Sequence, residues 1–187
     1  MINYRKKSLE KEKIKVLKKV LKSKHLTQGP YIEIFEKKLS NFFGSKFCVA
    51  FSSGTGALYS LGKALGWGKK DFIITTPISF LATSNCIEFC NANTEFVDIN
   101  NDYPTINVNE IKKKFFELKK KQKKVSAIIA VDYSGIPCDW KELKKFSKKH
   151  NITLINDNCH AMGTKYYGDT KYAIKYADYV VQSFHPV

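Results

Sequence analysis

Small and hydroxyl-bearing residues stand between an apolar run and a helical pattern at residues 52–56, Ser-Ser-Gly-Thr-Gly. The amino terminus of a helix offers free backbone amides and the positive end of the helix dipole, which together can hold a phosphate. Gly54, Thr55 and Gly56 are therefore candidate phosphate ligands. A Ser/Gly turn between a strand and a helix is also common without any ligand, so this segment alone leaves both interpretations open.

An aromatic ring and a carboxylate follow two further apolar runs. Phe80 comes shortly after residues 71–76, where its ring could stack on a flat cofactor, although an aromatic residue at helical spacing more often packs into a core. Asp157 ends the run 152–157, and a carboxylate at the end of a buried strand is costly unless a partner meets it. A cationic ring nitrogen would be such a partner. A helix cap or turn aspartate is the alternative.

A hydroxyl and an imidazole follow the last apolar run. Ser183 and His185 come after residues 178–182, and for His185 we favour a packed structural role over proton transfer. A phosphate-binding turn, a stacking ring and a carboxylate for a protonated ring nitrogen together suggest pyridoxal 5′-phosphate, whose electron-sink chemistry such a carboxylate enhances.

Short apolar runs alternate with longer amphipathic segments along the chain. Parallel neighbours need a crossover, and right-handed crossovers place helices on both faces of a sheet. The alternation therefore predicts an α/β fold, a three-layer sandwich around a mainly parallel sheet, with the candidate residues at the carboxyl ends of its strands. We expect strands at 46–51, 71–76, 94–99, 125–131, 152–157 and 178–184, and helices at 8–24, 30–42, 55–66, 80–91, 108–122 and 139–149.

The net charge is +15, from 32 basic and 17 acidic residues, but Arg5 is the only arginine. Because the guanidinium fork that reads bases and clamps phosphates is almost absent, the lysines indicate a solvated surface and no nucleic-acid partner. The five cysteines lack zinc-site or disulfide spacing, so no metal is expected. The sequence shows no signal peptide and no apolar run of about 18 residues, which predicts a cytoplasmic protein without a membrane partner.

Several stretches resemble, in order, the DegT/DnrJ/EryC1/StrS family of sugar aminotransferases, which are pyridoxal-phosphate enzymes. Within the family the sequence resembles most the branch that aminates UDP-linked 4-keto-6-deoxy sugars, as in the pseudaminic acid pathway. The amphipathic pattern at 8–24 predicts a helical arm at residues 1–25, and the resemblance implies, at 26–187, an incomplete large domain of the aspartate aminotransferase fold type (fold type I). The matching stretches are TQGPYIEIFEKKL (27–39), SSGTGAL (52–58), TTPISFLATSN (75–85), VDYSGIPCDW (131–140), INDNCHAMG (155–163) and SFHPV (183–187).

The resemblance also implies a role for each candidate residue. Gly54, Thr55 and Gly56 would hold the cofactor phosphate with Ser183. The remaining three would contact the pyridine ring: Phe80 would stack on it, Asp157 would pair with its nitrogen, and His160 would lie near its phenolic oxygen.

In this family the lysine that forms the Schiff base directly follows the SFHPV stretch, whereas this sequence ends at Val187. We therefore expect no catalytic residue within the chain, and the lysine directly after Val187. The expected activity is transfer of an amino group from glutamate to a nucleotide-linked 4-keto-6-deoxy sugar by a homodimer. Two alternatives remain: a truncated, inactive remnant of such an enzyme, and a related sugar dehydratase with histidine in place of the lysine.

Overall fold

The computed structural model describes residues 11–25 and 27–185. Of these, residues 11–25, 27–50 and 185 belong to one compact unit, and residues 51–184 form a second. All seven candidate cofactor residues fall in the second unit. The site is therefore built within a single unit.

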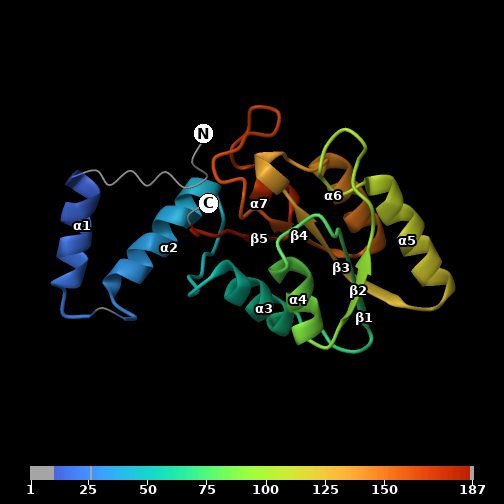
Figure 1. The fold of residues 1–187 in the computed structure, drawn as a ribbon, viewed down its shortest axis with the longest axis horizontal. Helices are drawn as coiled ribbons and strands as arrows, with labels where there is room; N and C mark the ends of the chain where they lie inside the picture. The colour runs from blue at the N-terminus through green and yellow to red at the C-terminus, as the bar shows by residue number, and fades with distance from the viewer. Residues whose placement is uncertain (1–10, 26, 186–187) are drawn as a thin grey trace, which may run out of the picture. The chain divides into compact units, whose positions relative to one another are not determined.

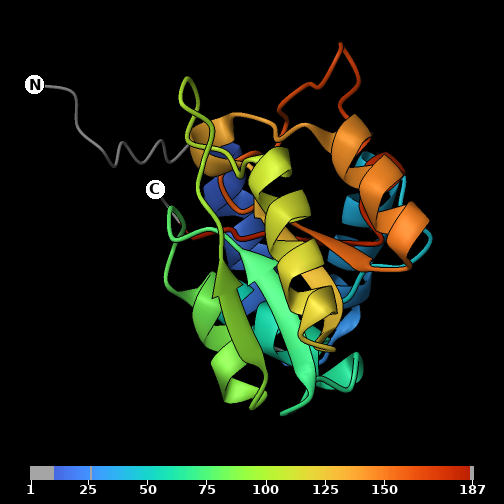
Figure 2. The same cartoon turned by 90° about the vertical axis from the view of Figure 1, so that its right-hand side faces the viewer.

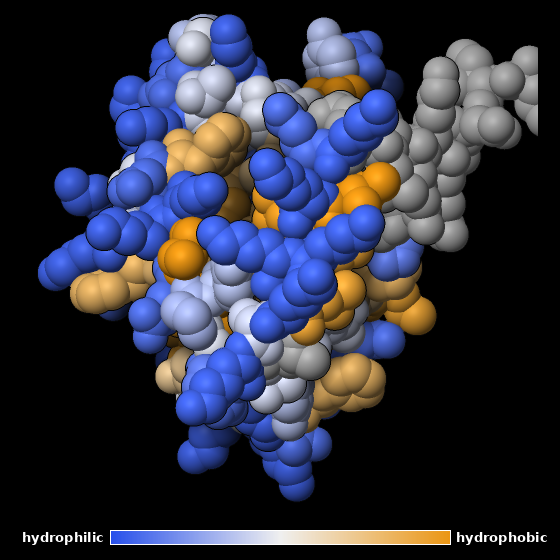
Figure 3. Space-filling model, turned by 90° about the vertical axis from the view of Figure 1, so that its left-hand side faces the viewer, coloured by the Kyte–Doolittle hydropathy of each residue, from blue (hydrophilic) through white to orange (hydrophobic). Residues whose placement is uncertain are grey.

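The first unit contains helices α1 (Lys11–Leu21) and α2 (Pro30–Phe43). Proline occupies the first turn of α2, where its missing N–H costs nothing, and Gly44 ends the helix with a left-handed φ of 75°. The face drawn in Figure 3 mixes hydrophilic and hydrophobic side chains. Both helices carry lysines, and they also expose apolar side chains such as Leu17 and Phe35.

The strand predicted at 46–51 is wrong, because this segment is irregular in the structure. Phe47 and Val49 are largely exposed instead of packed. The Ala50 N–H donates to Glu36 Oε1 at 2.7 Å, so a side-chain carboxylate takes the place that a neighbouring strand would fill. The alternating apolar pattern did not form a strand here, because such a pattern needs a neighbouring strand and burial of its apolar face.

The second unit is organised around a five-stranded parallel sheet in the order β2-β1-β3-β4-β5 (Figures 1 and 2). This confirms the predicted α/β architecture with a mainly parallel sheet. The strands are β1 (Asp71–Thr75), β2 (Asn93–Phe96), β3 (Lys124–Val131), β4 (Thr153–Asp157) and β5 (Tyr179–Val181).

Helices cover both faces of this sheet, with α4 and α5 on opposite sides in Figure 2. One core packs α3 and α4 against the sheet, and the other packs α5, α6 and α7. The sequence analysis missed the short helix α7. The helices are α3 (Gly54–Ala64), α4 (Ala82–Phe89), α5 (Val108–Lys120), α6 (Trp140–His150) and α7 (Tyr172–Tyr176), with a 3-10 turn at Tyr133–Gly135.

Strand β3 shows why the fold has three layers. Ile128 and Ala130 join the α5–α6 core, whereas Ala127 and Ile129 join the α3–α4 core, and all four side chains are fully buried. Successive side chains of a strand point to opposite faces, so an uninterrupted apolar run is buried on both sides.

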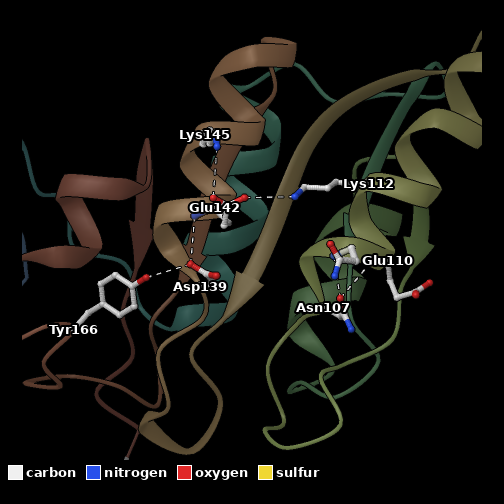
Figure 4. Close-up of polar contacts among 8 residues, drawn as sticks. Asn107, Glu110, Lys112, Asp139, Glu142, Lys145 and Tyr166 are labelled. Carbon is white, nitrogen blue, oxygen red and sulfur yellow. Dashed lines mark hydrogen bonds and ion pairs between the residues drawn. The ribbon is translucent and has the colours of Figure 1, made fainter.

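Helices α5 and α6 begin at side-chain caps, drawn in Figure 4. Asn107 accepts hydrogen bonds from amides of the first turn of α5, and Asp139 accepts one from the Glu142 amide of α6. Tyr166 donates its hydroxyl to Asp139, and Lys112 pairs with Glu142 at 3.4 Å across the two helices. These contacts set where each helix starts after its preceding loop.

Candidate functional site

The carboxyl ends of β3, β4 and β5 meet around Asp157. In the sheet register Asp157 lies beside Val131 at the end of β3 and beside Val181 at the end of β5. Residues after parallel strands share one edge of the sheet, which is where such folds bind ligands. The predicted carboxylate therefore lies at that edge of the sheet.

The start of α3 has the features of an anion-binding turn. Ser53 has an extended backbone, and its Oγ accepts a hydrogen bond from the Gly56 N–H at 3.0 Å. The N–H groups of Gly54 and Thr55 belong to the first turn and have no partner within the helix. Thr55 is exposed. These amides and the helix dipole favour a negatively charged group at this position.

Gly54 makes a close approach that joins this turn to two other strand ends. A Cβ on Gly54 would lie 3.2 Å from Ser183 Cβ and 3.4 Å from Cys159 Sγ. The first of these separations is tighter than ordinary van der Waals contact. The structure thus brings together two predicted phosphate ligands, Gly54 and Ser183, and places the turn after Asp157 beside them.

The Asp157 carboxylate is buried, with 4% of the residue exposed, and its hydrogen-bond donors are uncharged. Thr83 Oγ1 donates to Asp157 Oδ2 at 2.8 Å, and the Cys159 N–H donates to Oδ1 at 3.3 Å. Burial raises the pKa of Cys86 to about 12, and the nearby charges of Cys90 and Asp157 contribute further to this increase. Burial and the charge of Asp157 also raise the pKa of Cys159. The thiols around the carboxylate are therefore protonated at neutral pH.

Phe80 lies in the loop before α4, and 66% of the residue is exposed. Core packing, the alternative that its helical spacing favoured, is therefore wrong. Its carbonyl accepts the Thr83 N–H at 3.0 Å, which ties the loop to the first turn of α4. His185, for which we favour a packed role, is exposed in this chain.

His160 is half-buried and lies against the segment that follows β3. Its ring centroid is 5.3 Å from that of Tyr133, and a Cβ on Gly135 would lie 3.5 Å from the His160 carbonyl oxygen. His160 thus packs against the loop that follows β3, whereas Gly54 and Ser183 meet at the start of α3.

The sequence analysis missed Asp132, the fully buried residue that follows β3. Its backbone N–H donates to the Asp157 carbonyl at 3.2 Å, which links two neighbouring strand ends. Burial raises the pKa of Asp132 even though several donors meet its carboxylate. Inspection of every strand end would have found it, because it follows an apolar run as Asp157 does. The donors are the Cys138 N–H, Trp140 Nε1, Asn156 Nδ2, Asn158 Nδ2 and the Tyr172 hydroxyl.

The fold and the site together define a class of protein. A three-layer parallel sheet with a small-residue helix start, a buried carboxylate and an exposed ring at its carboxyl edge forms part of the large domain of the aspartate aminotransferase fold type.

The DegT/DnrJ/EryC1/StrS aminotransferase family matches residues 7–187, and the chain belongs to this family.

Relatives described as transaminases match nearly all of the chain. A UDP-4-amino-4,6-dideoxy-N-acetyl-beta-L-altrosamine transaminase of Campylobacter jejuni is 37% identical over 187 residues, which are 100% of this chain and 48% of that protein. A Helicobacter pylori protein with the same description is 35% identical over 96% of this chain and 46% of its own length. The chain thus spans about half the length of the curated relatives it matches.

Solved structures share the fold. Helicobacter pylori PseC, an aminotransferase of pseudaminic acid biosynthesis, matches with a TM-score of 0.86 and 33% identity over 98% of this chain and 48% of that one. Bacillus subtilis NtdA, solved with bound pyridoxamine phosphate (PMP), matches with a TM-score of 0.80 and 29% identity over 92% of this chain and 37% of that one.

Two further findings concern the described residues, 11–25 and 27–185. No helix there is both long and apolar enough to span a bilayer. In the same residues no three His, Cys, Asp or Glu side chains cluster in a way that could hold a metal ion.

Proposed function

We propose that the full-length gene product is a pyridoxal-phosphate-dependent aminotransferase acting on a nucleotide-linked 4-keto-6-deoxy sugar. The observation that carries the proposal is the convergence of Gly54, Ser183 and the Asp157 turn at one edge of the sheet. The relatives named as altrosamine transaminases and PseC support the sugar class.

The residues present fit this cofactor. At Gly54 a Cβ would crowd Ser183 and Cys159, whereas glycine leaves the amides of the helix start accessible to a phosphate. Asp157 is a buried carboxylate with only neutral donors around it, and a protonated ring nitrogen would give it a charged partner.

Each residue then has a defined task. The Gly54, Thr55 and Gly56 segment and the Ser183 hydroxyl would bind the phosphate, and the exposed Phe80 ring would cover one face of the pyridine. Asp157 would hold a proton on the ring nitrogen. Bound in this way, pyridoxal phosphate supplies an electron sink for amino transfer.

His160 completes the proposed set, and its task is to orient the ring through the phenolic oxygen. Its imidazole packs against the Tyr133 ring, which lies outside the phosphate turn. We further propose glutamate as the amino donor, a homodimer in the cytoplasm, and the reactive lysine directly after Val187.

The direct test uses the purified full-length gene product. With pyridoxal phosphate it should show a visible absorbance band that borohydride abolishes, and with glutamate it should aminate a UDP-linked 4-keto-6-deoxy sugar. A stable protein lacking both properties would overturn the proposal and favour an inactive remnant. Dehydration of the sugar without amino transfer would favour the dehydratase alternative.

Asp157→Asn tests the residue at the centre of the proposal. Removing the negative charge eliminates a charge-assisted hydrogen bond worth about 1.5–3 kcal/mol, so cofactor affinity should fall roughly 10- to 150-fold. Fluorescence titration measures the affinity. Asp102→Asn, at an exposed loop carboxylate, is the matched control and should bind like the unmodified protein.

A further inference from the structure

Thr83 links α4 to the carboxyl edge of the sheet through a single buried hydrogen bond. It lies in the first turn of α4 and is fully buried. Its Oγ1 donates to Asp157 Oδ2 at 2.8 Å, although 74 residues separate the two in sequence. Both side chains of this pair are shielded from bulk water.

This bond differs from what a threonine or serine in a helix usually makes. Such hydroxyls commonly donate to a backbone carbonyl of the preceding turn. The next residue, Ser84, does so, donating to the Leu81 carbonyl at 3.1 Å. Thr83 forgoes this local bond, and its hydroxyl meets the carboxylate instead.

The bond has two consequences for the carboxylate. A hydroxyl donor stabilises the anion without neutralising it, so the charge remains for a cationic partner. With the Cys159 N–H on Oδ1, the Thr83 hydroxyl on Oδ2 also restricts rotation of the carboxylate. Each oxygen keeps a further lone pair for another donor.

Thr83 also holds the candidate stacking residue. Its backbone N–H donates to the Phe80 carbonyl at 3.0 Å, so one residue contacts both the carboxylate and the segment that carries the exposed ring. A shift of Thr83 would therefore move both Asp157 and Phe80, the two residues proposed to contact the pyridine ring.

We propose that Thr83 is a positioning residue that orients Asp157 toward the ring nitrogen of the cofactor, an inference that rests on the proposed function. It acts through Asp157 and does not itself touch the reacting atoms.

The test measures binding of pyridoxamine 5′-phosphate to the full-length gene product by fluorescence, because this ligand needs no covalent link to a lysine. Thr83→Val keeps the shape but removes the donor, and it should weaken binding about tenfold. Thr83→Ser keeps the donor and should stay within about threefold of the unmodified protein.

Thr75→Val is the matched control. Thr75 is equally buried and donates its Oγ1 to the Ile129 carbonyl at 3.0 Å, so the substitution removes a buried threonine bond that does not involve Asp157. It should lower the melting temperature as Thr83→Val does, yet change affinity less than about twofold.

A double-mutant cycle separates positioning from general destabilisation. If Thr83 acts through Asp157, then Thr83→Val should have almost no further effect on affinity in an Asp157→Asn protein. Equal losses in both backgrounds, or equal affinities for Thr83→Val and Thr75→Val, would overturn the inference. If Thr83→Val does not fold, Thr83→Ala provides the same comparison with less crowding.

Failure of the proposed function gives a different result. In that case the unmodified protein would not bind pyridoxamine phosphate at all, before any variant is compared.

Discussion

At the scale of single residues, hydrogen-bonded carboxylates hold the strands in register at both edges of the sheet. Asp71 begins β1 at the amino edge and accepts hydrogen bonds from Lys124 Nζ at 2.7 Å, the Ser126 hydroxyl and the Gly68 N–H at 3.0 Å. Burial opposes its ionisation, but these donors outweigh burial and hold its pKa below the usual range. This carboxylate therefore ties β1 to the start of β3.

Asp71 makes stability depend on acid. Because its pKa is lower in the folded than in the unfolded chain, its stabilisation is fully present above the usual aspartate value of about 3.9 and is lost as pH falls through the folded value. Asp71→Asn should cost about 1–2 kcal/mol at pH 7 and make the free energy of unfolding less sensitive to pH below about pH 4. Urea unfolding at each pH measures this. An unchanged pH profile would contradict the assignment.

Thiol reactivity tests the environment around Asp157. With a pKa of about 12, Cys86 should be a thiolate in only about one part in ten thousand at pH 8. Burial also raises the pKa values of Cys138 and Cys159. These three thiols should therefore react slowly with a thiol reagent in the folded protein and rapidly in guanidinium, as mass spectrometry can follow residue by residue. Fast labelling of Cys86 in the folded protein would show that its burial is wrong.

At the scale of elements, helix α3 is held against its neighbours through a glycine. A Cβ on Gly62 would lie 2.7 Å from the Trp67 ring and 2.8 Å from Cys90 Sγ, both closer than real contacts allow. Periodicity predicted the helix correctly, but nothing in the pattern marked Gly62 as a point of close packing against Trp67 and Cys90.

Gly62→Ala should destabilise the protein. Alanine gains up to about 1 kcal/mol in helix propensity, but overpacking costs about 1–3 kcal/mol, and we expect the loss to win because Trp67 is a rigid, buried neighbour. Thermal unfolding measures the change. Gly56→Ala, in the same helix, is the control for stability: the nearest atom to its Cβ is 3.4 Å away, so its melting temperature should not fall.

At the scale of the whole molecule, the described residues expose much apolar surface. Phe47, Val49, Phe80 and Leu81 are each more than 60% exposed, and β5 is an edge strand of the sheet. Exposed apolar patches and unpaired strand edges promote association.

The 187-residue chain by itself should therefore self-associate. Light scattering should show particles larger than a monomer, and added salt should not disperse them, because burial of apolar surface and not the lysine charge drives the contact. A soluble monomer across the same salt range would contradict this expectation.

The parallel α/β architecture, most element positions and the strand ends at which Asp157 and Ser183 lie could be read from the sequence, because hydrophobic periodicity and burial on both sheet faces leave local patterns. The three-dimensional structure was needed to show that 46–51 is not a strand, that Phe80 is exposed, and that Thr83 and Asp132 hydrogen-bond to Asp157. These facts depend on which distant segments meet: Thr83 and Asp157 are 74 residues apart, and no local pattern encodes their contact. Local propensity sets what each segment forms, whereas packing between segments sets what each side chain touches.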